Sequence, residues 1–133
     1  MGKLGCVCGN VISDVACPNE VTGWILSDKS GEEFFNEIAA VVDDYLKHAS
    51  DCKTAKWRKK YFNNIYPNDV SPGGMIHDVL TSKFFDLSLA AMECDKCGRI
   101  MIQQKPDINK YHGYIPDESD SRNKILGYNK TNA

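Results

Sequence analysis

The 133-residue sequence predicts an α+β protein, in which a small antiparallel sheet carries an insertion of two or three helices. Two cysteine motifs, "CVCGN" at residues 6–10 and "CDKCGR" at residues 94–99, lie beside short apolar runs that are typical of strands. Between the motifs, apolar residues recur with the three- and four-residue spacing of helices. We therefore expect one domain over residues 1–133. Its expected parts are a β part (1–27 and 87–116), a helical insertion (28–86) and a polar tail (117–133).

The first elements are predicted to be strands, followed by a long helix. Residues 10–15 and 21–28 are apolar runs with β-branched side chains, separated by the turn-like "ACPNE". A helix follows at roughly 31–49, where Ser30 and Glu33 predict a capping box. Its apolar face consists of Phe34, Phe35, Ile38, Val41, Val42, Tyr45, Leu46 and Ala49.

Two shorter helices are expected next. The first is strongly basic and covers residues 54–66, where it must end because Pro67 disfavours helix at the preceding residue. The composition of residues 67–74 predicts a loop. Residues 75–85 predict the third helix, with one apolar side facing the core.

The periodicity changes to that of strands after the third helix. Residues 86–94 predict a strand that leads into the second cysteine motif, and residues 99–104 predict a strand that leaves it. A turn at "PDINK" and a returning strand at 111–116 complete a hairpin. In the polar tail, the residues expected to dock are Ile125, Leu126 and Tyr128.

The overall charge gives no reason to expect a general attraction to polyanions. The formal net charge is -2, with 16 basic against 18 acidic residues, so only a local patch would attract DNA or an anionic membrane. The N-terminal segment lacks the apolar run of a secretory signal, and no stretch approaches the ~20 apolar residues of a membrane span. We therefore expect a soluble, cytoplasmic protein that does not contact a membrane.

The four cysteines of the two motifs predict a metal site. Each pair precedes a glycine, which suits a tight turn that places two thiolates on one side of a loop. Four thiolates give a closed tetrahedral zinc site, so we expect one structural Zn²⁺ per chain. The predicted ligands are Cys6, Cys8, Cys94 and Cys97. Three alternatives stay open: disulfides, an iron–sulfur cluster with the same thiolates, and a redox dithiol at the second pair.

At these residues the chain resembles a zinc ribbon, a fold in which two Cys-x-x-Cys-Gly-like knuckles clamp one structural zinc. The resemblance covers roughly residues 5–14 and 87–116, including Gly9 and Gly98. The chain departs from the ribbon pattern in its tight first knuckle and in the long insertion between the knuckles. It is also similar to small uncharacterised bacterial proteins with an N-terminal Cys-x-Cys-Gly and a late Cys-x-x-Cys-Gly-Arg.

No motif in the sequence predicts catalysis, and we expect that the protein is not an enzyme. Four cysteines leave a zinc ion no open position, and the signatures of zinc deaminases, zinc proteases and phosphate loops are absent. His48, Cys52 and Cys17 would supply three ligands for a second metal, but single cysteines are more commonly buried apolar residues. His112 is interpreted as a surface histidine on the hairpin.

The segment "KTAKWRKK" combines positive charges with an aromatic residue, a pattern that suits contact with a nucleic acid. Its candidate residues are Lys53, Lys56, Trp57, Arg58, Lys59 and Lys60. The alternative is an ordinary helix in which Trp57, Tyr61 and Ile65 face the core and the charges are solvated.

Two functions follow from these patterns. The first is a non-catalytic, zinc-stabilised module that binds another protein, with a bacterial immunity or antitoxin protein and its toxin as a specific form that rests on analogy. The second is a zinc ribbon that binds nucleic acid through the basic helix. A small enzyme with a site in the helical insertion is a third hypothesis, for which the sequence names no residues.

Overall fold

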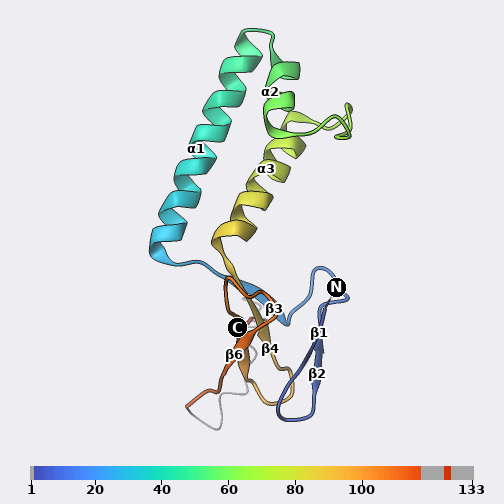
Figure 1. Ribbon diagram of the computed structural model, residues 1–133, viewed down its shortest axis with the longest axis vertical. Coiled ribbons are helices and arrows are strands. Elements are labelled where there is room, and N and C mark those ends of the chain that lie inside the picture. Colours follow the sequence, from blue (N-terminus) through green and yellow to red (C-terminus); the bar gives the residue numbers. More distant parts are fainter. Residues whose placement is uncertain (1, 118–124, 127–133) are drawn as a thin grey trace, which may run out of the picture. The chain divides into compact units, whose positions relative to one another are not determined.

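A computed structural model describes residues 2–117 and 125–126 of the chain. Three helices follow β3 and precede β4 in the chain, and all six strands pair in antiparallel sheets, which confirms the predicted α+β class (Figure 1). The strands are β1 (Lys3–Gly5), β2 (Val11–Ser13), β3 (Thr22–Ile25), β4 (Leu89–Glu93), β5 (Ile100–Gln103) and β6 (Tyr111–Tyr114). The helices are α1 (Asp28–Ser50), α2 (Thr54–Tyr61) and α3 (Pro72–Leu87). Among the described residues, no helix combines the length and the apolar character needed to cross a membrane.

The chain divides into two compact units. The β unit comprises the chain up to Ile25 and from Leu89 onward, and the helical unit comprises Leu26–Ser88. Each unit has its own cluster of buried residues, and the two clusters share no member. The expectation of a single domain over residues 1–133 stays a prediction.

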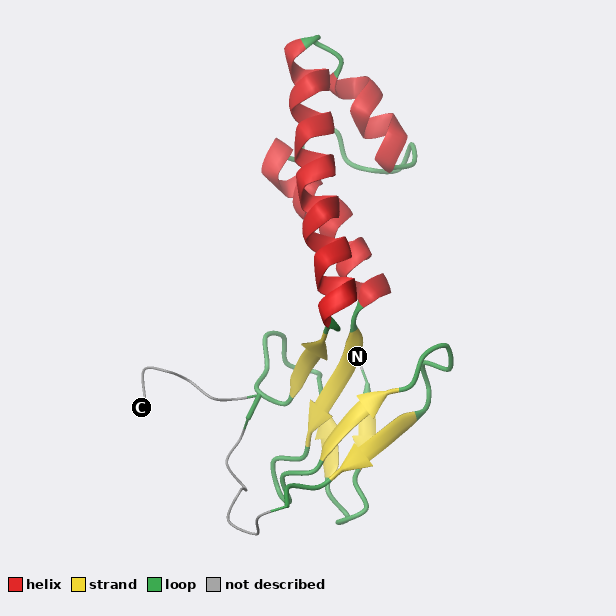
Figure 2. Ribbon diagram, turned by 90° about the vertical axis from the view of Figure 1, so that its left-hand side faces the viewer, coloured by secondary structure: helices red, strands yellow, loops and turns green. Residues whose placement is uncertain are grey.

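The β unit contains two antiparallel sheets, drawn in yellow in Figure 2. One is the hairpin β1–β2, with Leu4 opposite Ile12. The other has the strand order β3-β4-β5-β6, and its central pair β4–β5 places Met92 opposite Met101. Strand β1 was not predicted, because its three residues are too few to show an alternating pattern. Both cysteine motifs lie at hairpin turns, between β1 and β2 and between β4 and β5.

A small core lies between the two sheets of the β unit. Ile12 from β2 and Met92 and Met101 from the larger sheet are buried together with Cys6 and Cys94. Cysteine sulfurs therefore belong to the core as well as to the cysteine site. This packing explains why the hairpin β1–β2, which is too small to be stable in water alone, is held against the larger sheet.

One buried carboxylate connects the tail to the β unit. Glu93 is only 3% exposed, and its oxygens accept hydrogen bonds from the backbone N–H groups of Ile125 and Leu126 at 2.9–3.0 Å. The side chain of Leu126 lies over Gly23, where a Cβ would approach it to 2.8 Å. The predicted docking is confirmed for Leu126, whereas Ile125 is held only by its backbone N–H and its side chain is 59% exposed. Tyr128 lies outside the described residues.

In the helical unit, α1 and α3 lie side by side and run in opposite directions, as Figure 1 shows. Phe34 of α1 meets Phe84 of α3 edge to face, with ring centroids 5.4 Å apart. Helix α1 begins earlier than predicted, because the Ser27 side chain accepts a hydrogen bond from the backbone N–H of Ser30 at 3.1 Å. Ser30 is therefore inside the first turn, and the predicted capping box with Glu33 was wrong.

The limits of α2 and α3 also differ from the prediction. Helix α2 ends at Tyr61 instead of residue 66, because Phe62 adopts an extended conformation and its ring stacks on Tyr66 with centroids 3.7 Å apart. Helix α3 begins at Pro72, three residues early, with Ser71 as its N-cap. Proline is well suited to the first turn of a helix, where its missing N–H has no partner to lose.

The core of the helical unit is aromatic and centres on Trp57, which is 0% exposed. Its ring contacts Tyr45 of α1 with centroids 5.0 Å apart and Tyr61 of α2 at 4.7 Å. The prediction that Trp57 and Tyr61 of α2 face the core is thus correct. The same prediction is wrong for Ile65, which is 88% exposed because the helix has ended before it.

Candidate metal centre

Each cysteine pair lies on a tight loop whose hydrogen bonds are of the same kind. In the first loop, the N–H of Cys6 donates to the Asn10 carbonyl at 2.8 Å, and the N–H of Gly9 donates to the Cys6 carbonyl at 2.9 Å. In the second loop, the N–H of Cys94 donates to Arg99 and the N–H of Gly98 donates to Cys94, at 2.8 and 2.9 Å. The same two kinds of hydrogen bond therefore close both loops, although the first loop is one residue shorter.

The backbone conformation of each loop explains why a glycine follows the second cysteine. Gly9 has φ 91° and Gly98 has φ 76°, in the left-handed region that side chains with a Cβ disfavour. In both loops the glycine follows the second cysteine directly and turns the chain toward the next strand. The sequence Cys-x-Cys-Gly therefore makes the same type of turn as Cys-x-x-Cys-Gly.

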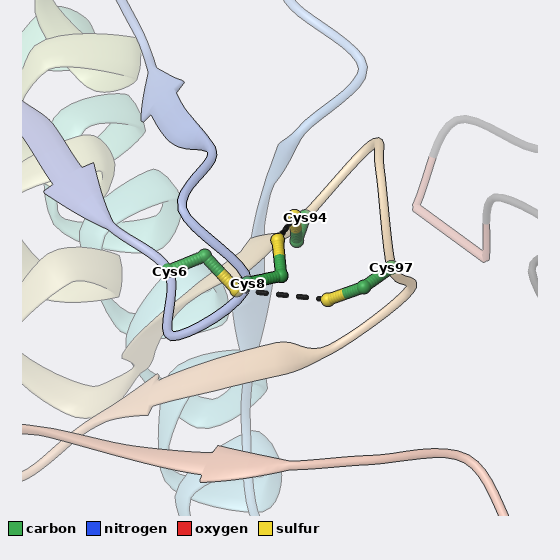
Figure 3. A group of neighbouring side chains, drawn as sticks. All are labelled: Cys6, Cys8, Cys94 and Cys97. Atoms are coloured by element: carbon green, nitrogen blue, oxygen red, sulfur yellow. Dashed lines mark hydrogen bonds between the residues drawn. The ribbon is translucent and has the colours of Figure 1, made fainter.

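The two loops bring four sulfurs together, as Figure 3 shows. The Sγ atoms of Cys6 and Cys97 are 3.6 Å apart, those of Cys8 and Cys94 are 3.7 Å apart, and all four lie within 4.8 Å of one another. A tetrahedral ion with metal–sulfur bonds of ~2.3 Å requires sulfur–sulfur separations of about 3.8 Å. These distances exceed a disulfide bond, and all four cysteines are free. The cluster is thus consistent with a single metal site, as predicted.

The thiols of the metal-free site differ in acidity. Burial raises the pKa of Cys94, but the N–H of Cys97 and the side-chain amide of Asn10 outweigh it and lower that pKa to about 6. The N–H of Cys8 lowers the pKa of Cys6, but burial and hydrogen bonds with the neighbouring thiols together raise it to about 12. A metal ion that binds here must therefore displace protons, most of all from Cys6.

Asn10 is a site residue that the sequence reasoning missed. Its Nδ2 donates to Cys94 Sγ at 3.4 Å and to the Asp95 carboxylate at 2.7 Å, so it joins the first loop to the second. Hydrogen bonds to ligating sulfurs orient them and reduce their charge. The available signal was its position directly after Cys8-Gly9, where the first loop returns toward its strand.

The donor set determines what the site can do. Four cysteines fill all positions of a tetrahedral ion, and a catalytic zinc site keeps one position open for water or substrate. Sulfur-only tetrahedral sites suit zinc and iron–sulfur centres, so the donor atoms alone do not identify the metal. The arrangement suits a structural role, in which metal binding stabilises the fold.

The other candidate ligands are not brought together. Among the residues that the structure describes, the four cysteines are the one group suited to hold a metal. Cys17 belongs to the β unit and Cys52 to the helical unit, and both are exposed, so the interpretation as buried apolar residues was wrong. His48 Nδ1 lies 2.8 Å from the Asp44 carbonyl within α1. His112 is exposed beside Gln104, which confirms its interpretation as a surface histidine.

The basic residues of α2 have different surroundings. Trp57 is fully buried and therefore presents no ring face on which a base could stack. Lys60 is paired with Asp44 at 2.8 Å, and Arg58 is half-buried. The remaining candidates, Lys53, Lys56 and Lys59, are exposed, and their role in nucleic-acid contact stays a prediction.

The sequence matches a known family. No curated protein and no solved structure matches the chain. A family model described as "Domain of unknown function (DUF8617)" matches residues 2–118, which include both cysteine loops and the three helices. The chain therefore belongs to this family.

Proposed function

We propose that the protein is a non-catalytic module that binds another protein and that one structural Zn²⁺ ion stabilises. The observation that carries this proposal is the closed set of four cysteine sulfurs, which leaves a metal ion no position for substrate. The proposed ligands are Cys6, Cys8, Cys94 and Cys97. The resemblance of the two loops to zinc-ribbon knuckles supports zinc as the metal. Cys94 and Cys97 come from a turn between two strands, whereas a redox dithiol favours a helix N-terminus.

An apolar stripe on α1 supports a protein partner. Phe35 and Leu46 are 66% and 58% exposed. Ala39, which is exposed, and the half-buried Val42 lie between them at helical spacing, so the four side chains follow one side of the helix. Large apolar side chains that line up on a surface are more typical of an interaction site than of a solvated face.

The specific form of this proposal is a bacterial immunity or antitoxin protein that acts in the cytoplasm on a toxin. It rests on the small size and slightly acidic net charge of the chain. Immunity and antitoxin proteins often share these two features, so the support is an analogy. Such a protein needs a stable scaffold and a recognition surface but no catalytic group. The metal site would supply the former and the α1 stripe the latter.

Metal content is the first test. Protein purified without chelator and without added metal is expected to contain one zinc per chain by elemental analysis, with a native mass that includes the ion. A chain that contains no metal, or iron with the visible absorption of a cluster, would contradict the zinc proposal.

Partner binding is tested with charged variants of the stripe. The double variant Phe35→Lys/Leu46→Lys is expected to lose a partner that the tagged wild-type protein retains, while its thermal unfolding changes little, because both side chains are largely exposed. Ile65→Lys is the matched control, since it places the same charge at an exposed apolar residue outside α1. A partner retained equally by all three proteins would exclude the stripe as the binding surface.

Nucleic-acid binding is the second candidate, and the exposure of Lys53, Lys56 and Lys59 favours it. Binding through these lysines would weaken steeply with salt, by a log–log slope of about −0.7 to −0.9 for each phosphate neutralised. The variant Lys56→Glu/Lys59→Glu is expected to reduce that slope, whereas Lys29→Glu on α1 is not. An absence of DNA and RNA binding at low salt would end this alternative.

A further inference from the structure

Two neighbouring cavities in the helical unit share the residues Arg58 and Asn68. The larger has a volume of about 250 Å³ and extends to Tyr45 of α1 and Met75 of α3. The smaller has a volume of about 140 Å³ and extends to Asn64, in the segment after α2. All residues around both cavities belong to Leu26–Ser88, so this unit alone forms them.

The polar lining of the cavities includes two cations and several uncharged donors. The smaller cavity is lined by Arg58, Lys59, Tyr66 and three asparagines, and no carboxylate lines either cavity. Arg58 has no ion pair or side-chain hydrogen bond with another described residue, in contrast to Lys60, which Asp44 neutralises at 2.8 Å. The amide groups of Asn64 and Asn68 likewise have no partner within residues 2–117 and 125–126.

Arg58 is partly buried and has no anionic partner among the described residues, which is unfavourable for a charged group. The side chain is half-buried, unlike its exposed neighbours Lys56 and Lys59. A cation that has lost part of its water is stabilised by an anion with matching hydrogen-bond geometry, and the guanidinium fork fits the paired oxygens of phosphate or carboxylate. The donors around the cavities therefore point to an anionic ligand.

The number of donors favours phosphate over carboxylate. A phosphate monoester has three terminal oxygens and a charge of about −1.5 to −2 at neutral pH, which two cations would balance. Arg58 and Lys59 supply these two charges, and Asn64 and Asn68 supply further N–H groups. A carboxylate offers two oxygens and a single charge, so it would leave part of this donor set without a partner.

The larger cavity also has apolar lining residues, which are Ala55, Val70, Pro72 and Met75, together with the ring of Tyr45. Binding sites for small molecules commonly combine such a surface with a few polar groups, and they range upward from about 300 Å³. A cavity of about 250 Å³ thus suits a compact ligand that has an apolar part beside its anionic group.

We propose that the paired cavities at Arg58 and Asn68 bind a small organic phosphate, with the phosphate at Arg58 and Lys59 and the apolar part against Val70 and Met75. This site is separate from the cysteine cluster, since its residues belong to the other unit. It goes beyond the proposed protein-binding function and does not depend on it. The phosphate could belong to a free small molecule or to a nucleic acid, and the experiment distinguishes these sources.

The test is a titration of the metal-loaded, full-length, isotopically labelled protein, followed by NMR. The probes are inorganic phosphate, phenyl phosphate, phenol and an oligothymidylate without a terminal phosphate. We expect saturable shifts of the Arg58 side-chain N–H and the Asn68 amide with phenyl phosphate. We expect inorganic phosphate to bind more weakly, because it does not use the apolar lining residues, and phenol not to bind. Binding of the oligothymidylate alone would place a nucleic-acid backbone here and overturn the proposal.

Variants distinguish a specific site from general attraction to a basic helix. Arg58→Gln is expected to weaken phenyl phosphate binding about tenfold or more, as for the loss of a charged hydrogen bond. Lys56→Gln is the matched control, because it removes the same charge from an exposed position on α2 outside both cavities. Equal weakening in these two variants would overturn the proposal.

A second variant covers the event that Arg58→Gln disturbs the fold. Asn68 is exposed in the segment between α2 and α3, so Asn68→Ala should leave thermal unfolding unchanged. Weaker phenyl phosphate binding by Asn68→Ala supports the site. Unchanged binding by this variant would contradict it, because Asn68 is common to both cavities.

Discussion

The β unit and the helical unit are stabilised by different kinds of interaction. The β unit has a small core that includes two of its four clustered cysteines, Cys6 and Cys94. The helical unit has no such cluster among its described residues, and its core is built around the aromatic ring of Trp57. Short strands bury little apolar surface, so we propose that the β unit depends on metal binding, whereas the aromatic side chains of the helical unit bury enough surface for a core of their own.

The difference implies that each unit of the chain can lose its stability through a different treatment. Treatments that remove a metal should affect the β unit, and truncation of an aromatic side chain should affect the helical unit.

The largest effect is expected from the loss of one cysteine ligand. Cys94→Ser should abolish stoichiometric metal binding and unfold the β unit, because structural zinc contributes about 10–16 kcal/mol in zinc-finger peptides, comparable to the whole stability of a domain. Most of the helical circular dichroism should remain. Hydrogen exchange by residue measures the two units separately.

Cys17→Ser is the control for this variant, because Cys17 is exposed in the same unit and outside the cluster. Simultaneous loss of protection in both units would show that the helical unit depends on the metal after all.

The second-largest effect is expected from mild acid, which should destabilise the β unit at a higher pH than the helical unit. Without a bound metal, the pKa of Cys94 is lowered to about 6, so its contribution to folding is present above its unfolded pKa and is lost as the pH falls through 6. Protons also compete with a metal ion for the thiolates, so acid favours metal release. The hydrogen bond from Lys60 lowers the pKa of Asp44, and that from Tyr66 lowers the pKa of Asp78, so their contributions persist until the pH falls below about 4.

At pH 5 we therefore expect metal release with the helices retained. A colorimetric chelator reports the metal while far-ultraviolet circular dichroism reports the helices. Retention of metal at pH 5, or loss of helix at the same pH as metal, would contradict the expected order.

Trp57→Ala should destabilise the helical unit and leave the β unit unchanged. Removal of a fully buried aromatic side chain is expected to lower the free energy of unfolding of the helical unit by about 3–5 kcal/mol. Metal content should be unchanged, since Trp57 belongs to the other cluster of buried residues. Chemical denaturation with a metal assay on the same samples measures both, and Ile65→Ala, at an exposed apolar residue, should change neither.

The smallest effect is expected from Asn10→Ala. Loss of the hydrogen bonds to Cys94 Sγ and to Asp95 should weaken metal binding about 10–100-fold without unfolding the loaded protein. Competition with a chelator of known affinity measures this change. Asn109→Ala is the control, because Asn109 is exposed in the turn between β5 and β6 and makes no contact with the four cysteines. Equal affinities in both variants would show that Asn10 does not support the metal site.

The sequence predicted the two cysteine loops well because the geometry of each loop is local. A cysteine pair followed by a glycine specifies a tight turn, and Gly9 and Gly98 adopt the left-handed conformations that such turns require. The strands on both sides of the second motif were also visible as apolar runs. Asn10 escaped notice because its partner Cys94 is distant in the sequence, and no local pattern shows such a contact.

Helix limits were predicted less well, because several residues could end or begin each helix. Both Ser27 and Ser30 precede the apolar run of α1, and the structure uses the first of them as the cap. The periodicity of α2 continues to residue 66, but stacking of Phe62 on Tyr66 favours an extended chain after Tyr61. A ring contact just beyond the helix therefore overrides the repeat.

By itself, the sequence determined the fold class, the four clustered cysteines and the presence of three helices, because turns and amphipathic faces depend on neighbouring residues. The tertiary structure alone decided that Trp57 is buried, that Ile65 is exposed and that Arg58 lies beside two cavities without a carboxylate. The physical reason is that burial and charge pairing depend on which segments meet in space. The one-dimensional pattern of a basic, aromatic helix is the same whether its tryptophan faces the core or the solvent.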